Sequence, residues 1–304
     1  MRDKILGWSS SRYDLFKLCR RQYFYQYYGL KFTDFITRER VAALKKLMSG
    51  PLFVGQAAHD LIAAVLRRFQ NNPGEIEPEK FYAYAEKIIE QQYRNAQFLE
   101  TYYRKDPVEP AALSADTRKV LEDFFGSRWY HWIRETALEN RKSWLVEPGD
   151  FGLCFVGGLK AYCKVDFAFP LGDKIYVLDW KTGKIDLDKH RKQLLGYVHY
   201  ATEHFKVPAS RVKAGLCYVG KERQELEPEF SGQEVEAFKA LVKKETEDMY
   251  SFCLEVGENV PLGIEEFHPC NKPNICRLCN YQEICLGSGL APEDTPAAAP
   301  ELDF

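Results

Sequence analysis

The chain has 304 residues, with 42 Lys and Arg, 44 Asp and Glu, and a formal net charge of −2. This balance excludes a histone-like or polybasic protein. Its 45% hydrophobic and 28% charged residues are ordinary for a globular chain with a real core, and its length suits one large domain or two fused ones. No run of residues approaches the ~18 apolar positions of a membrane span.

The first half of the chain is predicted to be largely helical. Apolar residues recur at helical spacing in four stretches, at about 10–28, 51–70, 78–104 and 114–141. A serine at position 9, 10 or 11 could cap the first helix, and Pro51 opens the second. The Asn-Asn-Pro-Gly cluster at 71–74 ends that second helix.

From Trp144 onward the sequence changes to short runs rich in Val, Phe, Tyr and Leu. Strands are expected at 144–147, 151–156, 159–169, 174–181 and 212–219. Helices are expected at about 188–205 and 231–255. This β-β-β-α-β order predicts an α/β fold whose central mixed sheet is flanked by helices.

The composition divides the chain into four parts. They are a helical part at 1–143, a core at 144–260, a Cys-rich loop-like segment at 261–286 and an acidic tail at 287–304. The tail is expected to be disordered, because it combines Gly, Ser, Pro, Ala and acidic residues without an apolar pattern.

Charge is unevenly distributed along the chain. Residues 1–46 hold eleven basic and four acidic residues, a net of +7, and residues 181–223 hold ten basic and four acidic ones, a net of +6. Two such segments in a near-neutral chain suggest a local site for an anionic partner. Either segment taken alone is better explained as a solvated helix face.

Two aspartates and a lysine lie on strands that are expected to be neighbours. Side chains alternate along a strand, so Asp179 and Lys181 share one face of strand 174–181, and Asp166 lies on the polar face of 159–169. If these strands pair, the two carboxylates approach and repel each other, which a hard divalent cation relieves. Lys181 could orient a water molecule or stabilise negative charge. Asp-x-Lys alone is a common string, and an exposed ion pair is the alternative.

Other polar residues recur at spacings that would direct them to one site. His59 lies four positions after a glycine on an expected helix, and Gln193 and Tyr197 lie four apart on another. Glu147 ends the strand at 144–147. Taken singly, each is better explained as an ordinary core, surface or strand-end residue.

In their order along the chain, these residues resemble the RecB-like branch of the PD-(D/E)XK nuclease superfamily. The matching motifs are Gly55-x3-His59, Glu147, Asp166, Asp179-Trp-Lys181-Thr-Gly183 and Gln193-x3-Tyr197, within about residues 9–286. Val165 precedes Asp166 where the name of the superfamily has proline. The resemblance implies a restriction-endonuclease-like core that hydrolyses phosphodiester bonds.

The resemblance also implies a role for each residue. The implied ligands of Mg²⁺ or Mn²⁺ are His59, Asp166, Asp179 and the main-chain carbonyl of Trp180. The implied catalytic residues are Lys181, Glu147, Gln193 and Tyr197. The lysine would assist the attacking water, the glutamate would support the site, and the Gln/Tyr pair would lie beside the scissile strand.

The sequence has nine cysteines and no apolar export signal at its start. We therefore expect a reducing, cytoplasmic setting in which clustered cysteines bind metal. Cys276, Cys279 and Cys285 form a tight group, and spacing alone favours Cys270 as the fourth ligand of a local zinc site, with Cys19 as the alternative. The remaining cysteines lie in apolar contexts and are expected in the core: Cys154, Cys163, Cys217 and Cys253.

The segment around Cys19, Leu18-Cys19-Arg20-Arg21, looks like the N-terminal motif of iron–sulfur nucleases of this branch. Those include the AddB nuclease domain and CRISPR-associated RecB-like exonucleases, which hold a [4Fe–4S] cluster on one early and three late cysteines. The resemblance thus implies a cluster on Cys19, Cys276, Cys279 and Cys285, with Cys270 unused. Such a cluster would close a very long loop.

The same segment mixes cations with aromatic rings over residues 20–28. A path for single-stranded DNA needs backbone neutralisation and base stacking, the latter contributing about 1–3 kcal/mol per base. Helical spacing directs about half of these rings to the core. Arg20 and Arg21 are therefore the residues expected nearest to DNA.

Together these inferences predict a Mg²⁺- or Mn²⁺-dependent deoxyribonuclease, an exonuclease on single-stranded DNA in repair, recombination or CRISPR adaptation. The sequence has no P-loop motif, so a helicase motor would be a separate partner, and a CRISPR integrase is another expected partner. Two alternatives stay open. One is a non-catalytic DNA-binding or scaffold subunit of such a complex, and the other is a zinc-stabilised protein without nuclease activity.

Overall fold

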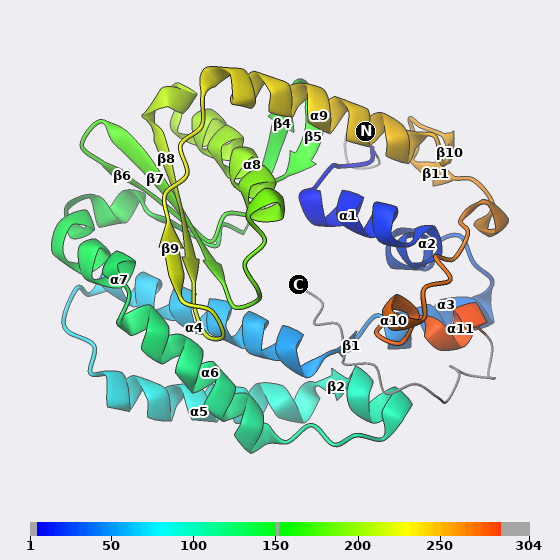
Figure 1. The fold of residues 1–304 in the computed structure, drawn as a ribbon, viewed down its shortest axis with the longest axis horizontal. Helices are drawn as coiled ribbons and strands as arrows, with labels where there is room; N and C mark the ends of the chain where they lie inside the picture. Colours follow the sequence, from blue (N-terminus) through cyan, green and yellow to red (C-terminus); the bar gives the residue numbers. More distant parts are fainter. Residues whose placement is uncertain (1–4, 150–151, 287–304) are drawn as a thin grey trace. The chain divides into compact units, whose positions relative to one another are not determined.

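The computed structural model describes residues 5–149 and 152–286, which form two compact units (Figure 1). The cysteine unit comprises residues 5–48, 96–106 and 241–286, and the sheet unit comprises residues 49–95, 107–149 and 152–240. The predicted tail at 287–304 lies outside the described residues. Within the described ranges, no helix combines the length and the apolar character needed to cross a membrane.

The sheet unit is built around a five-stranded mixed sheet with the spatial order β3-β6-β7-β8-β9. These strands are β3 (Leu145–Val146), β6 (Phe167–Leu171), β7 (Lys174–Lys181), β8 (Val212–Tyr218) and β9 (Gln224–Leu226). β6 and β7 are antiparallel, whereas β7 and β8 are parallel and are joined by the helix α8 (Leu187–Phe205). A parallel pair needs such a crossover. The prediction of an α/β fold with a central mixed sheet is confirmed.

A separate hairpin, β4 (Leu153–Val156) and β5 (Leu159–Tyr162), precedes β6 in the chain. Gly157 and Gly158 form its two-residue turn with φ values of 58° and 81°, a backbone conformation that favours glycine. The single strand predicted at 159–169 is therefore wrong. It is two strands, β5 and β6, because residues 163–166 leave the ladder between them.

The two faces of β7 have different surroundings because its side chains alternate. The Trp180 ring lies edge-on to Phe124 of α6 (Pro110–Phe125), with 5.2 Å between ring centres. Asp179 and Lys181 point to the opposite face, where they contact side chains of α8. The apolar face thus anchors the strand, and the polar face presents its charged residues to one helix.

In the sheet unit, α6 packs against both α4 (Gly50–Asn71) and α5 (Pro78–Asn95) (Figure 1). Ser49 caps α4 by accepting the N–H of Leu52, and Pro51 lies in the first turn, where its missing N–H costs nothing. The helix predicted at 51–70 is confirmed.

The single helix predicted at 114–141 is wrong, because Gly126 and Ser127 interrupt it and Ser127 caps a new helix. The elements after the break are α7 (Arg128–Trp132), a π-helical segment (Ile133–Ala137) and a 3-10 segment (Leu138–Ser143).

The cysteine unit combines short helices with two small strand pairs. Its helices are α1 (Ser10–Leu18), α2 (Arg20–Tyr27), α3 (Phe35–Leu44), a π-helical segment (Glu100–Arg104), a 3-10 segment (Ile264–Glu266), α10 (Pro273–Cys276) and α11 (Gln282–Leu286). Its strand pairs are β1 (Leu47–Met48) with β2 (Gln97–Phe98), and β10 (Cys253–Glu255) with β11 (Val260–Pro261). The helix α9 (Gly232–Tyr250) begins in the sheet unit and ends in the cysteine unit.

Two of the predicted helices that include residues of the cysteine unit are shorter than expected. The helix predicted at 10–28 is α1 and α2, because Cys19 between them is extended, with φ −157° and ψ 111°. The helix predicted at 78–104 ends at Asn95. The break at Cys19 matters for the cysteine pocket described below, because it directs this side chain away from the regular helical positions.

We predict that Gly215→Ala lowers the free energy of unfolding by about 1–3 kcal/mol, the usual cost of overpacking. A Cβ at position 215 would lie 2.7 Å from the side chains of both Leu178 and Trp129, so one of them must move. Urea unfolding followed by tryptophan fluorescence measures the change. Gly232→Ala is the matched control, because a Cβ at position 232 would meet nothing within 4 Å. Equal stability of the two variants would contradict the packing described for β8.

Candidate functional site

Two buried carboxylates face each other across the β6–β7 pair. The register places Phe167 opposite Leu178, so the next pair outward is Asp166 and Asp179. Asp166 is 7% exposed and Asp179 is 1% exposed. The main-chain N–H of Trp180 donates to Asp166 Oδ2 at 3.0 Å, which fixes this carboxylate at the end of β7. The strand register therefore brings two carboxylates together at a position that is nearly inaccessible to water.

This crowding changes the proton affinity of each group. Burial raises the pKa of Asp179 to about 6, and the charge of Asp166 adds to the rise. Burial also opposes ionisation of Asp166, but His59 and Lys181 outweigh it and lower the pKa of Asp166 overall. Burial likewise favours the neutral form of His59, yet Asp166 raises the pKa of His59 overall. A cation beside the two carboxylates would favour their charged forms.

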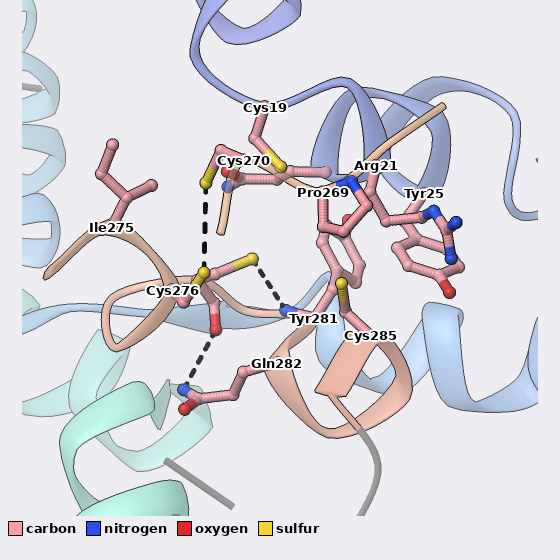
Figure 2. Close-up of a pocket in the computed structure, with 12 residues that line it drawn as sticks. Cys19, Arg21, Tyr25, Pro269, Cys270, Ile275, Cys276, Tyr281, Gln282 and Cys285 are labelled. Atoms are coloured by element: carbon pink, nitrogen blue, oxygen red, sulfur yellow. Dashed lines mark hydrogen bonds between the residues drawn. The ribbon is translucent and has the colours of Figure 1, made fainter. Parts of the chain in front are cut away.

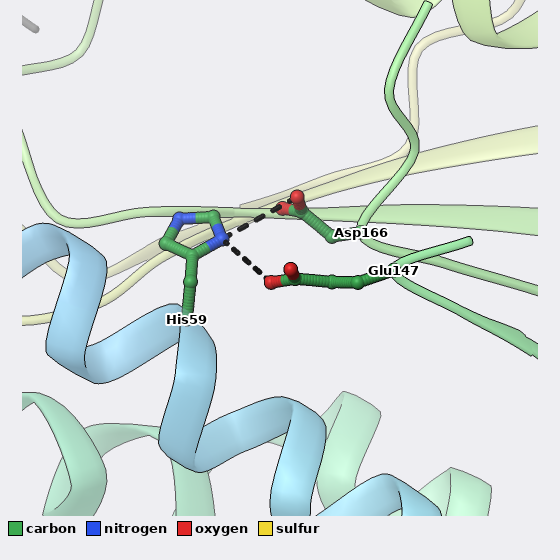
Figure 3. Close-up of side chains that lie close together, drawn as sticks. All are labelled: His59, Glu147 and Asp166. Atoms are coloured by element: carbon green, nitrogen blue, oxygen red, sulfur yellow. Dashed lines mark ion pairs between the residues drawn. The ribbon is translucent and has the colours of Figure 1, made fainter. Parts of the chain in front are cut away.

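His59 of α4 and Glu147 at the end of β3 complete a compact group with Asp166 (Figure 3). His59 Nδ1 lies 3.3 Å from Asp166 Oδ1 and 3.9 Å from Glu147 Oε1. One ligand atom from each residue lies within 4.8 Å of the others. Two carboxylate oxygens and an imidazole nitrogen form a donor set that suits Mg²⁺ or Mn²⁺. The motif order predicts only a supporting role for Glu147, whereas the structure places it in this group.

Lys181 lies in a closed ring of four polar side chains. Its Nζ is 2.8 Å from Asp179 Oδ2 and donates to Gln193 Oε1 at 2.7 Å. The Gln193 amide donates to Tyr197 Oη at 2.5 Å, and the Tyr197 hydroxyl donates to Asp179 Oδ1 at 3.0 Å. Each side chain fixes the orientation of the next. Gln193 and Tyr197, one turn apart on α8, thereby hold the lysine against the aspartate.

A glycine lets α4 approach the end of β7. A Cβ at Gly55 would lie 3.1 Å from Thr182 Oγ1, closer than most side-chain contacts allow. Gly55 is one helical turn before His59, so this approach occurs on the same side of α4 as the histidine. The predicted Gly-x3-His spacing therefore has a steric reason in the structure.

Two contacts near the site were not predicted. Lys164 Nζ donates to Glu147 Oε2 at 3.0 Å, and His190 Nδ1 lies 2.6 Å from Tyr218 Oη. Lys164 could have been found from its alternation with Asp166 along the chain. The His190 contact had no sequence signal, because it depends on how α8 packs on β8.

Five cysteines line one pocket of the cysteine unit (Figure 2). Cys19 comes from the break between α1 and α2, and the others come from the C-terminal segment: Cys270, Cys276, Cys279 and Cys285. Cys270 Sγ and Cys276 Sγ are 4.0 Å apart, and the N–H of Tyr281 donates to Cys279 Sγ at 3.4 Å. The structure therefore brings the early cysteine and all four late ones together.

Three of these thiols, those of Cys19, Cys279 and Cys285, have a raised pKa. Burial raises the pKa of Cys279 to about 12, and the nearby Cys19, Cys285 and Cys276 add to the rise. Burial raises the pKa of Cys285 as well, although the Arg21 guanidinium opposes it. A bound metal would reverse this balance, because coordination deprotonates a thiol. The donor set and its burial fit a thiolate-ligated metal centre.

Arg20 and Arg21 make internal contacts in the cysteine unit. The Arg20 guanidinium lies 3.3 Å from the centre of the Phe16 ring, and Arg21 Nε donates to the carbonyl of Phe267 at 2.8 Å. Arg21 also lines the cysteine pocket. Both side chains are half-buried, and their contact with DNA stays a prediction.

We predict that Asp179→Asn stabilises the metal-free protein relative to wild type, by an amount that grows about 1 kcal/mol from pH 5 to pH 7. The pKa of about 6 in the folded state lies above the ordinary aspartate value of about 3.9. The protonated carboxyl therefore contributes full stability below about pH 4, which is lost as pH rises through 6.

Urea unfolding in chelator at both pH values measures this difference. Asp173→Asn is the matched control, since that side chain is 70% exposed on the same β6–β7 hairpin. Parallel pH dependences of wild type and Asp179→Asn would contradict the buried pair.

The comparisons with known proteins agree with this geometry. A model of the PD-(D/E)XK nuclease superfamily matches residues 7–286, which include the whole sheet, the carboxylate group and all five pocket cysteines. A search of curated proteins finds no match. The central mixed sheet flanked by helices is consistent with a restriction-endonuclease-like fold. The chain belongs to the PD-(D/E)XK nuclease superfamily.

Proposed function

We propose that this protein is a metal-dependent deoxyribonuclease of the RecB-like branch, which hydrolyses single-stranded DNA from a free end. The observation that carries this proposal is the buried pair of Asp166 and Asp179 with Lys181 held at its edge by Gln193 and Tyr197. A structural ion pair would not need two carboxylates at this position.

The metal would be held by four side chains and a main-chain group: His59, Glu147, Asp166, Asp179 and the carbonyl of Trp180. Three of these side chains already have ligand atoms within 4.8 Å of one another, and the fourth faces Asp166 across the strand pair. Bound there, Mg²⁺ or Mn²⁺ would lower the pKa of a water molecule and polarise the phosphate.

Lys181 would orient the attacking water or stabilise the negative charge that develops on the phosphate. An ammonium group has three N–H donors, and Asp179 and Gln193 take two of them. The third can orient the attacking water or stabilise a phosphate oxygen. The ring through Gln193 and Tyr197 restrains the lysine before substrate binds, which reduces the cost of organising the site.

We also propose that Cys19, Cys276, Cys279 and Cys285 bind a [4Fe–4S] cluster. Thiolates around a single zinc ion lie about 3.8 Å apart, given Zn–S distances of ~2.3 Å. In the described residues no three cysteine sulfurs lie within 4.8 Å of one another, although Cys270 Sγ and Cys276 Sγ are 4.0 Å apart. A four-iron cluster separates its ligands further than one ion does.

We infer the pathway and partners from the resemblance of the ordered motifs to the RecB-like branch. We place the protein in the cytoplasm, in DNA repair, recombination or CRISPR adaptation, beside a helicase or a CRISPR integrase. A non-catalytic scaffold subunit and a zinc-stabilised protein are the competing functions, and the two experiments below separate them from a nuclease.

For activity, we predict that wild type degrades end-labelled single-stranded DNA with Mg²⁺ or Mn²⁺ and is inactive in chelator. Lys181→Ala and Asp179→Ala should each lower the rate at least about 100-fold, because they remove transition-state charge stabilisation or a metal ligand. Labels at the 5′ or the 3′ end report polarity. Lys174→Ala, at the far end of the same strand, should keep wild-type activity. Equal degradation by wild type and both site variants would exclude this site.

For the cysteine pocket, we predict that protein purified without oxygen is brown and contains about four irons and four sulfides per chain. Cys19→Ser should lose the colour and the iron, whereas Cys270→Ser should keep both. These two cysteines line the same pocket, so each variant controls for the other. A colourless protein with one zinc, lost in Cys270→Ser and kept in Cys19→Ser, would show the local zinc site instead.

A further inference from the structure

We propose that the outer face of the β4–β5 hairpin binds the single-stranded nucleic acid next to the scissile bond, by stacking bases on Phe155 and Tyr162. This proposal rests on the proposed function, since it names the surface that would hold the substrate of the same site. No motif of the sequence assigns a role to this hairpin.

The hairpin has one apolar inner face and one exposed aromatic face. Cys154, Val156 and Ala161 are at most 2% exposed. The alternate residues point outward, where Phe155 is 41% exposed and Tyr162 is 36% exposed. Leu153, which pairs with Tyr162, is 41% exposed as well, so the outer face carries a contiguous apolar group rather than single exposed side chains, and such groups mark interaction sites.

The strand register makes these outward residues one surface. Leu153 pairs with Tyr162, and Phe155 pairs with Lys160. Opposite residues in an antiparallel pair lie about 5 Å apart, and diagonal ones about 7–8 Å apart, so Phe155 and Tyr162 are close neighbours. Lys160 Nζ lies 5.4 Å from the centre of the Tyr162 ring. The face therefore combines two rings with a cation.

The hairpin leads along the chain to the candidate active site, through the irregular residues 163–166. Every second residue after Tyr162 leads through Lys164 to Asp166, and Lys164 Nζ already donates to Glu147 Oε2 at 3.0 Å. Four residues span at most about 14 Å between Cα atoms, which limits the backbone separation of Tyr162 and Asp166 to that length. A strand whose phosphate is at Asp166 would have its neighbouring nucleotides beside the hairpin.

The chemistry of the face selects its ligand. Lys160 and Lys164 favour an anionic backbone, and the flat rings favour the unpaired bases of a single strand, whose faces are accessible for stacking. A duplex hides those base faces inside its own stack. The charge of Glu203 is directed at the hairpin backbone, because its carboxylate accepts the N–H of Phe155 at 3.0 Å.

The test uses the full-length protein with a short fluorescein-labelled oligothymidylate, and binding is measured by anisotropy in chelator so that no cleavage occurs. Phe155→Ala and Tyr162→Ala should each weaken binding about 5-fold to 150-fold, the loss expected for one stacked base. Tyr162→Phe should bind as wild type, because it keeps the ring. Tyr84→Ala is the matched control, since this tyrosine is 47% exposed on α5 in the same unit.

Binding to a blunt duplex of the same length should change less than twofold in every variant. With Mg²⁺ or Mn²⁺ present, both alanine variants should raise KM for the oligothymidylate with kcat unchanged, the signature of lost ground-state binding. Thermal unfolding at the wild-type temperature confirms that the exposed substitutions leave the fold intact.

Equal oligothymidylate binding by wild type and both alanine variants would overturn the proposal, whether or not the protein cleaves DNA. Equal losses for the single strand and the duplex would also overturn it, because stacking requires unpaired bases. If the alanine variants lose binding while wild type cleaves nothing, the proposed nuclease activity fails and the binding surface stands.

Discussion

The close approach of two buried carboxylates determines how the polar groups around them are arranged in the sheet unit. Asp166 and Asp179 are fixed opposite one another by the β6–β7 register, and both are nearly excluded from water. Buried charges of one sign are stable only with compensating partners. The Trp180 amide, the Tyr197 hydroxyl and Lys181 each supply part of that compensation. The need to balance these two charges therefore orients residues of both β7 and α8.

The cysteine pocket also crowds ionisable groups together away from water, but its donors are thiols rather than carboxylates. Five thiols are gathered in one pocket, where burial raises the pKa of Cys19, Cys279 and Cys285. Carboxylate oxygens favour hard divalent ions, whereas thiolates favour zinc or iron–sulfur centres. The two donor sets therefore suit different classes of ion.

Side chains alternate between the two faces of a strand, and this alternation connects the charged residues of β7 to the rest of the sheet unit. On β7, the side of the strand that carries Trp180 packs against α6, and the side that carries Asp179 contacts α8. The β4–β5 hairpin uses the same rule, with an apolar inner face and an aromatic, basic outer face. Because period-2 alternation is strict, a buried face leaves its opposite face available for charge or ligand.

The sequence by itself predicted the α/β class, most strand positions and the ordered residues from His59 to Tyr197, because apolar periodicity and motif spacing are local properties. It missed the break at Cys19 and the division of strand 159–169. It also missed the approach of Glu147 to His59 and the contact of Lys164 with Glu147. Only the tertiary structure decided these, because they depend on strand register, helix packing and a local backbone conformation that overrides helical spacing. Cys19 and Cys270 also meet in one pocket only through the tertiary structure, since no local pattern encodes contacts between residues so far apart in the chain.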